Sequence, residues 1–211
     1  TAVDTISATS AFCAYLLHGV TGSGKTEVYL QTAARVLARS EQTQVLILVP
    51  EINLTPQLEG NIRNRFPGLQ IATLHSGMAE GERLLHWLAA HTGRARIILG
   101  TRLAILSSLP HLKLIVIDEE HDPSYKQQEG FRYHARDVAL YRGHLQGCPV
   151  ILGSATPSTE SYHLAELGKL HLLELNQRAG VAVLPKMHII DLKIAKKKHG
   201  ISQTLIEQIK Q

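Results

Sequence analysis

Short apolar runs alternate along the chain with longer stretches in which apolar residues recur at helical spacing. The runs predict strands at 14–20, 45–49, 71–74, 96–99, 114–118, 150–152 and 170–175. The stretches between them predict helices at 25–40, 55–65, 80–91, 135–146 and 158–167. Strands that alternate with helices are typical of a parallel sheet covered by helices. Because the runs 45–49 and 114–117 are apolar throughout, they should be central strands that are buried on both faces.

The alternation stops near Asn176. We therefore expect an α/β domain over residues 1–175 and a separate segment over residues 176–211, in which 201–211 could begin another helix. The chain carries a net charge of +4, and residues 176–211 alone hold seven basic and two acidic residues. The lysines at 193 and 196–198 could belong to a solvated linker or could bind phosphate directly.

Composition excludes several classes of protein. With 211 residues and 44% hydrophobic residues, the chain has enough apolar material for a core, so it is not disordered. It has no apolar run long enough to span a membrane and no signal peptide, so we expect no membrane attachment. The two cysteines, Cys13 and Cys148, are far apart, which fits a reduced cytoplasmic protein, and the twelve histidines show no zinc-ligand spacing. Since the first residue is Thr, the chain is expected to be a piece of a longer protein.

A phosphate-binding motif follows the first predicted strand. Residues 19–26 read GVTGSGKT and fit G-x-x-x-x-G-K-[ST] between a strand and a helix. Glycines allow successive N–H groups to turn toward anionic oxygens, and the helix start adds its positive dipole. Lys25 should reach the β- and γ-phosphates of ATP, and Thr26 should offer its hydroxyl to Mg²⁺. The predicted nucleotide-binding residues are Gly19, Thr21, Gly22, Ser23, Gly24, Lys25 and Thr26.

The run 114–117 breaks into a second polar motif, Asp118-Glu119-Glu120-His121. Parallel strands place their carboxyl ends at one edge of the sheet, where ligands bind, so this motif should lie near the phosphate-binding loop. Asp118 is the expected Mg²⁺ ligand, and Glu119 should orient or deprotonate the attacking water.

The stretch 125–142 interleaves aromatic with basic residues. Tyr125, Phe131 and Tyr133 stand among Lys126 and Arg132, a composition that suits base stacking together with phosphate neutralisation. We expect Phe131 to be exposed, because it follows a polar loop. We expect Tyr141, which falls in the next helix, to lie in the core or at its boundary, and Trp87, which shares a helix face with leucines, to lie in the core.

A family resemblance rests on several of these motifs together. Asp118-Glu-Glu-His121 and Gly153-Ser-Ala-Thr-Pro157 resemble motifs of superfamily 2 helicases of the DExH type. The segments 49–56 and 99–102 look like two further helicase motifs. With residues 19–29, 74–77 and 125–130 added, the set is similar to the bacterial replication-restart helicases over essentially the whole chain.

The resemblance implies a RecA-like P-loop NTPase fold and a role for each motif. His121 would couple the nucleotide state to Ser154 and Thr156. Asn53, Thr55, Thr101 and Arg102 would lie on the face that tracks single-stranded DNA, although Arg102 could instead form a structural salt bridge. The loop after Tyr125 would sense DNA, and Phe131 stands where a Trp is expected in such helicases.

The resemblance also implies binding partners and indicates that the chain is only part of the complete enzyme. The full protein would translocate 3′→5′ on single-stranded and forked DNA in replication restart, with single-strand-binding protein and primosome proteins as partners. Such helicases close two RecA-like lobes on ATP, and their zinc-binding cysteines are outside this chain. Residues 1–175 should be the first lobe, and residues 176–211 should be a basic linker and the start of the second lobe. The chain should hydrolyse ATP poorly alone. A P-loop phosphotransferase and a non-catalytic nucleic-acid or primosome-binding module are the alternative functions.

Overall fold

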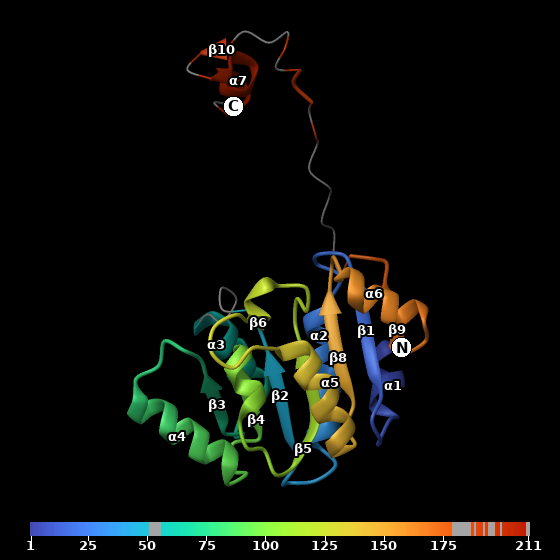
Figure 1. The fold of residues 1–211 in the computed structure, drawn as a ribbon, viewed down its shortest axis with the longest axis vertical. Coiled ribbons are helices and arrows are strands. Elements are labelled where there is room, and N and C mark those ends of the chain that lie inside the picture. Colours follow the sequence, from blue (N-terminus) through green and yellow to red (C-terminus); the bar gives the residue numbers. More distant parts are fainter. Residues whose placement is uncertain are drawn as a thin grey trace. The chain divides into compact units, whose positions relative to one another are not determined.

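A seven-stranded sheet with all strands parallel forms the centre of the first of two units, Thr1–Ala179 and Gly180–Gln211 (Figure 1). The computed structural model describes residues 1–50, 56–178, 187, 189–191, 193, 197–198 and 200–209. The strands are β1 (Ala14–Gly19), β2 (Gln44–Leu48), β3 (Ile71–Leu74), β4 (Ile97–Gly100), β5 (Leu112–Ile117), β8 (Val150–Ser154) and β9 (His171–Leu175). Their order in the sheet is β3-β4-β2-β5-β8-β1-β9. The RecA-like α/β fold expected from the sequence is confirmed, because each connection between consecutive strands of this sheet carries a helical segment and all its paired strands are parallel.

Helices cover both faces of the sheet. They are α1 (Ala2–Ser7), α2 (Lys25–Leu37), α3 (Pro56–Arg65), α4 (Glu80–His91), α5 (Ala135–Gln146) and α6 (Thr159–Glu166), with short 3₁₀ turns η2 (Arg102–Leu106) and η3 (Pro123–Tyr125). Side chains of α1, α2 and α3 pack in one core cluster, and those of α4, η2 and α5 pack in the other. Neighbouring residues of one strand enter different clusters, as Leu16 and Leu17 do, because strand side chains alternate between faces.

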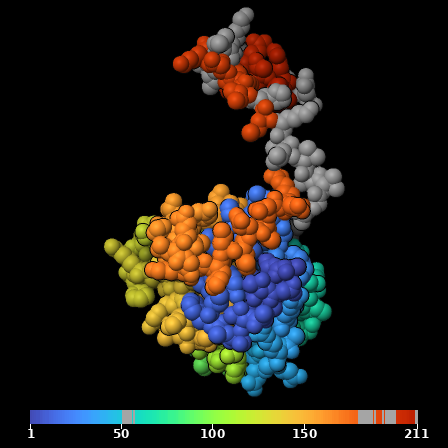
Figure 2. Space-filling view, turned by 90° about the vertical axis from the view of Figure 1, so that its right-hand side faces the viewer, coloured from blue at the N-terminus to red at the C-terminus, as the bar shows by residue number. Residues whose placement is uncertain are grey.

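The first and last strands of this unit lie side by side at one edge of the sheet. β9 pairs with β1 in parallel, from Tyr15 opposite His171 to Gly19 opposite Leu175. Figure 2 shows the blue N-terminal residues and the orange residues of the α6–β9 region side by side on one face. β1 is therefore an interior strand, paired with β8 on one side and β9 on the other.

A two-stranded hairpin interrupts the connection between β5 and α5. It consists of β6 (Lys126–Gln127) and β7 (Tyr133–His134), which pair in antiparallel orientation. In the second unit, β10 (Lys197–Lys198) and β11 (Ile201–Ser202) also pair in antiparallel orientation, and α7 (Gln203–Ile209) follows. The expectation that this segment begins a second helicase lobe stays a prediction.

Three expectations about elements need correction. A short helix, α1, was not expected; a capping box between Thr1 and Asp4 starts it. Trp87 is not in the core: it is 37% exposed and stacks on His91, because α4 buries only its Ala89 and Ala90 stripe. Tyr141 is likewise exposed on α5.

Candidate functional site

The phosphate-binding loop connects β1 to α2 by a tight turn. Gly22 and Gly24 have φ values of 78° and 89°, a conformation that glycine adopts without steric cost. A Cβ on Gly19 would lie 2.4 Å from Ser23 Oγ, so any larger residue at this position would force the Ser23 side chain to move. Ser23 Oγ is buried without a hydrogen-bond partner among the described residues. An unpaired polar atom in a glycine cradle at a helix N-terminus fits an anionic phosphate group.

Lys25 joins this loop to the acidic turn after β5. Its buried Nζ donates a hydrogen bond to the Gly19 carbonyl oxygen at 2.8 Å and lies 3.9 Å from Glu119 Oε1. The two motifs are far apart in sequence, but β1 and β5 flank β8 and end at the same edge of the sheet. The predicted nucleotide and metal groups therefore share one site.

Asp118 is held from two directions. Its N–H donates to the Leu48 carbonyl oxygen at 2.9 Å, and Tyr29 Oη donates to Asp118 Oδ1 at 3.1 Å. Burial, followed by the charge of Glu119, raises the pKa of Asp118, while Tyr29 and Lys25 oppose that shift. Burial also raises the pKa of Tyr29 well above its usual value, so Tyr29 stays a donor. A bound divalent cation would favour the ionised carboxylate.

Glu119 has an unusual backbone conformation. Its φ of 46° is the only positive value of a non-glycine residue in the described part of the chain. Such a conformation typically costs about 1–3 kcal/mol and occurs preferentially at functional sites. It places the Glu119 carboxylate near Lys25 Nζ and, through Oε2, 3.6 Å from His121 Nδ1.

The cleft at this edge has a volume of about 360 Å³ and is lined by Thr21, Gly22, Gly24, Lys25, Thr26, Asp118 and Glu119. The residues fit a magnesium–nucleotide complex, in which Thr26 and Asp118 would hold the metal. Mg²⁺ keeps several waters and substrate phosphates as ligands, so two protein oxygens are sufficient. Over the described ranges there is no group of three or more His, Cys, Asp and Glu side chains that could hold a metal ion. No zinc site is therefore assigned to these residues.

His121 lies against the segment that follows β8. Its Nδ1 is 2.7 Å from Ser154 Oγ, and its Nε2 is 3.4 Å from Thr156 Oγ1. The structure thus brings together the residues that were expected to couple the nucleotide state to this segment.

Glu120 was given no role from the sequence, yet it is fully buried. Its carboxylate accepts hydrogen bonds from Ser158 N at 2.7 Å, Ser158 Oγ at 3.1 Å and Ser161 Oγ at 2.8 Å. Arg136 Nη1 lies 3.5 Å from Glu120 Oε2. The acidic turn is therefore fixed to the N-termini of α5 and α6. The sequence did offer a signal for Glu120, because this acidic residue stands between Glu119 and His121, both of which had expected roles.

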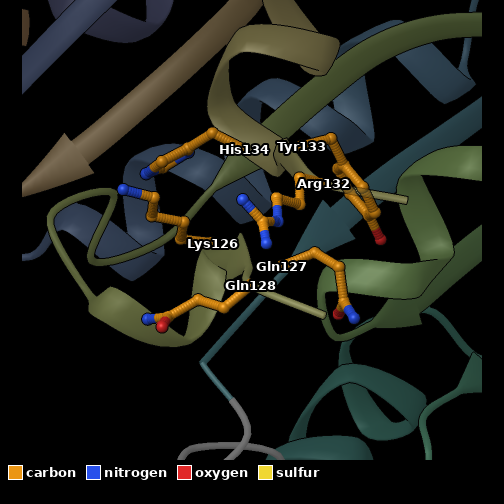
Figure 3. Close-up of a pocket in the computed structure, with 6 residues that line it drawn as sticks. All are labelled: Lys126, Gln127, Gln128, Arg132, Tyr133 and His134. Carbon is orange, nitrogen blue, oxygen red and sulfur yellow. The ribbon is translucent and has the colours of Figure 1, made fainter. Parts of the chain in front are cut away.

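The hairpin 126–134 forms a second, basic pocket of about 560 Å³. Its lining residues are Lys126, Gln127, Gln128, Arg132, Tyr133 and His134. In Figure 3 the Arg132 guanidinium lies at the centre, with Lys126 and His134 on one side and Gln127 and Tyr133 on the other. Phe131 is 77% exposed, as expected, and its ring centroid lies 5.9 Å from that of Tyr133. An exposed ring beside two cations suits a nucleic-acid strand.

Three residues expected at the DNA surface have other positions. Tyr125 is fully buried, and its hydroxyl donates to the Asp118 carbonyl oxygen at 2.7 Å, so it cannot stack on a base. Thr101 is also buried. Arg102 Nη1 donates to the carbonyl oxygens of Ser124 and Lys126, so it holds the chain at the start of the hairpin. Asn53 and Thr55 lie outside the described residues.

Comparisons with known proteins agree with this fold. Residues 2–164 match the family model of the DEAD/DEAH box helicases, and the chain belongs to this family. Among curated proteins, the chain is 47% identical over 179 residues to the replication restart protein PriA of Bacillus subtilis, covering 85% of this chain and 22% of that protein. It is 44% identical over 201 residues to PriA of Haemophilus influenzae, covering 95% and 27%. The chain thus spans about a quarter of the length of these relatives.

A solved structure supports the fold independently. The helicase MrfA bound to DNA superposes with a TM-score of 0.59 at 18% identity, covering 84% of this chain and 26% of that one. At this identity the likeness concerns the fold alone. Within the described residues, no helix is both long and apolar enough to cross a membrane.

Proposed function

We propose that this chain is the ATP-binding lobe of an ATP-dependent DNA helicase that moves 3′→5′ and acts in replication restart. The observation that supports this most directly is the shared cleft, in which Lys25 of one motif lies 3.9 Å from Glu119 of the other. The similarity to two PriA proteins supports the biological role.

The residues of the cleft have separate tasks in this proposal. Lys25 neutralises phosphate charge, and Thr26 and Asp118 hold the metal. Bound Mg²⁺ would supply charge neutralisation at the phosphate oxygens. Glu119 orients a water molecule in line with the terminal phosphate and accepts its proton. Tyr29 keeps the Asp118 carboxylate directed into the cleft through the hydrogen bond to Oδ1.

Single-stranded and forked DNA is the proposed nucleic-acid partner. Lys126 and Arg132 would neutralise its phosphates and Phe131 would stack on a base. Single-strand-binding protein and primosome proteins are the proposed protein partners, in the cytoplasm. Zinc, where the parent protein uses it, would be bound by residues outside this chain.

A second RecA-like lobe, outside this chain, would complete the catalytic site. The chain covers 22% and 27% of its PriA relatives, and a second lobe in such enzymes supplies a charge that stabilises the transition state. We therefore expect residues 1–211 alone to hydrolyse ATP slowly.

The test is ATP hydrolysis by the full-length protein with and without forked DNA. DNA should raise the rate, and Lys25→Ala or Glu119→Gln should abolish it. Lys113→Ala, which removes an exposed lysine on β5, is the matched control and should behave as the unsubstituted protein. Transfer of phosphate to an acceptor other than water would indicate a phosphotransferase. If Lys25→Ala left both partner binding and unwinding by the full-length protein intact, this chain would be a non-catalytic binding module.

A further inference from the structure

The hairpin 126–134 is attached at both of its ends to the acidic turn 118–121. At its start, the hydroxyl of the buried Tyr125 donates to the Asp118 carbonyl oxygen at 2.7 Å. At its end, Arg136, the second residue of α5, lies 3.5 Å from the Glu120 carboxylate. The turn that carries Asp118 and Glu119 is therefore the common anchor of the loop.

The attachment at Tyr125 is rigid. Arg102 Nη1 donates to the carbonyl oxygens on either side of Tyr125, to Ser124 at 2.6 Å and to Lys126 at 3.1 Å. Asp122 Oδ1 accepts a hydrogen bond from Ser124 N at 2.8 Å, and Tyr125 N donates to the Asp122 carbonyl oxygen at 3.2 Å. A displacement of the strand that begins at Lys126 would therefore move the Tyr125 side chain with it.

The outer part of the hairpin is weakly held in comparison. Its two strands have two residues each and pair only through Lys126 with His134 and Gln127 with Tyr133. A two-stranded ribbon of this length is marginally stable by itself. Phe131 and Arg132, at its outer end, are exposed at the surface. A nucleic acid bound there can change the position of the hairpin.

The atom that Tyr125 contacts has a specific consequence for catalysis. The Asp118 carbonyl belongs to the peptide group that joins Asp118 to Glu119, so a rotation of this group changes φ of Glu119. That angle is already in the left-handed region, at 46°. Release of such a conformation toward the ordinary regions would reorient the Glu119 carboxylate.

We propose that Tyr125 is a positioning residue that transmits nucleic-acid binding at the hairpin 126–134 to the peptide group between Asp118 and Glu119. Through its hydroxyl, movement of the hairpin sets the orientation of the Glu119 carboxylate. This inference rests on the proposed function, because it needs a DNA-dependent ATPase. It assigns to Tyr125 a role in the interior of the protein in place of base stacking.

The experiment measures ATP hydrolysis by the full-length protein with and without saturating single-stranded oligothymidine. Tyr125→Phe keeps the buried ring and removes only the hydroxyl. It should lower the stimulation by DNA about fivefold, the factor that corresponds to one lost hydrogen bond. Its affinities for a fluorescent ATP analogue and for the oligonucleotide should stay within about twofold of the original, which a general loss of structure would not allow. Tyr141→Phe, which removes a hydroxyl from an exposed ring, is the matched control and should leave the stimulation unchanged.

Two further variants make the test specific to this route. Arg102→Lys cannot bind both flanking carbonyls as the guanidinium does, so it should also lower the stimulation. Phe131→Ala should lower it by reducing contact with DNA, and the double variant Tyr125→Phe/Phe131→Ala should be no worse than the worse single variant. Full DNA stimulation of ATP hydrolysis in Tyr125→Phe would overturn this inference but not the proposed function. The same holds if the effects of the two single variants multiply in the double variant. Absence of stimulation in the unsubstituted protein would overturn the proposed function as well.

Discussion

Gly153, in β8, is a position where the addition of a single methyl group should damage both the fold and the site. A Cβ built there would lie 1.6 Å from Tyr29 Oη and 2.6 Å from Tyr29 Cζ. Tyr29 is almost completely buried and donates to Asp118 Oδ1, so it cannot move aside without losing that hydrogen bond. Gly153→Ala should therefore destabilise the fold and misplace Asp118 together.

The magnitude follows from two contributions. Overpacking a dense core costs about 1–3 kcal/mol. Loss of a hydrogen bond to a charged group costs about 1.5–3 kcal/mol. We expect the free energy of unfolding to fall by about 3–5 kcal/mol, a large part of the total of about 5–15 kcal/mol that is usual for a domain.

The assay is urea unfolding of four proteins: the unsubstituted chain, Gly153→Ala, Tyr29→Phe and the double variant. Removing the hydroxyl relieves the 1.6 Å contact but not the contact with Cζ, so the double variant should be less destabilised than the sum of the single variants by about 1–2 kcal/mol. Gly81→Ala, at the second residue of α4, is the control; beyond its neighbours and its own helix backbone, its Cβ meets nothing within 4 Å, so it should not lower the free energy of unfolding. Strict additivity of Gly153→Ala and Tyr29→Phe would refute the steric reasoning.

Three further predictions concern other parts of the first unit. Glu120→Gln should lower the free energy of unfolding by about 1.5–3 kcal/mol in urea, because it removes the buried charge that accepts hydrogen bonds from Ser158 and Ser161 and leaves Arg136 with the exposed Asp137 as its charged partner; a change below about 1 kcal/mol would contradict it. Burial raises the pKa of Cys148 to about 11, so at about pH 8 Cys13 should react faster with a disulfide reagent, and Cys148 should speed up as the pH rises toward that value. The slower of the two thiol reactions is assigned to Cys148. If a Cys148→Ser variant still showed this slower reaction, the assignment would be wrong. His121→Ala should impair DNA unwinding by the full-length protein more than its affinity for ATP, because it removes the contact with the segment after β8; equal losses would count against this coupling.

The sheet and the nucleotide site could be predicted because their signals are local. Strands buried on both faces read as apolar runs, and the six inner or covered strands could be located in this way to within about three residues. The edge strand β9 is largely exposed and was found from its place after the last predicted helix. The two polar motifs at residues 19–26 and 118–121 directly follow such runs, and parallel strands bring their ends to one edge. The motifs and the parallel topology are together sufficient to predict that Lys25 and Glu119 lie in one site.

The missed features depend on which way a side chain points. An aromatic residue beside lysines suggests stacking, but Tyr125 is turned into the core, where its hydroxyl has a backbone partner. Tyr29 lies four residues after Lys25 on the same helix face, a spacing that could have indicated a place in the site. The exposure of Trp87 follows from a helix that covers only an edge of the sheet, which periodicity alone cannot reveal.

The pairing of β9 with β1 has a mechanical consequence. The last paired residue of β9, Leu175, lies opposite Gly19, the first residue of the phosphate-binding loop, and a Cβ on Gly19 would come within 3.0 Å of the Leu175 Cβ. A pull on the polypeptide beyond residue 175, directed along the strand, would load this parallel ladder in shear and reach the nucleotide cradle through a single neighbouring strand. Force and ATP occupancy would then act on the same glycine.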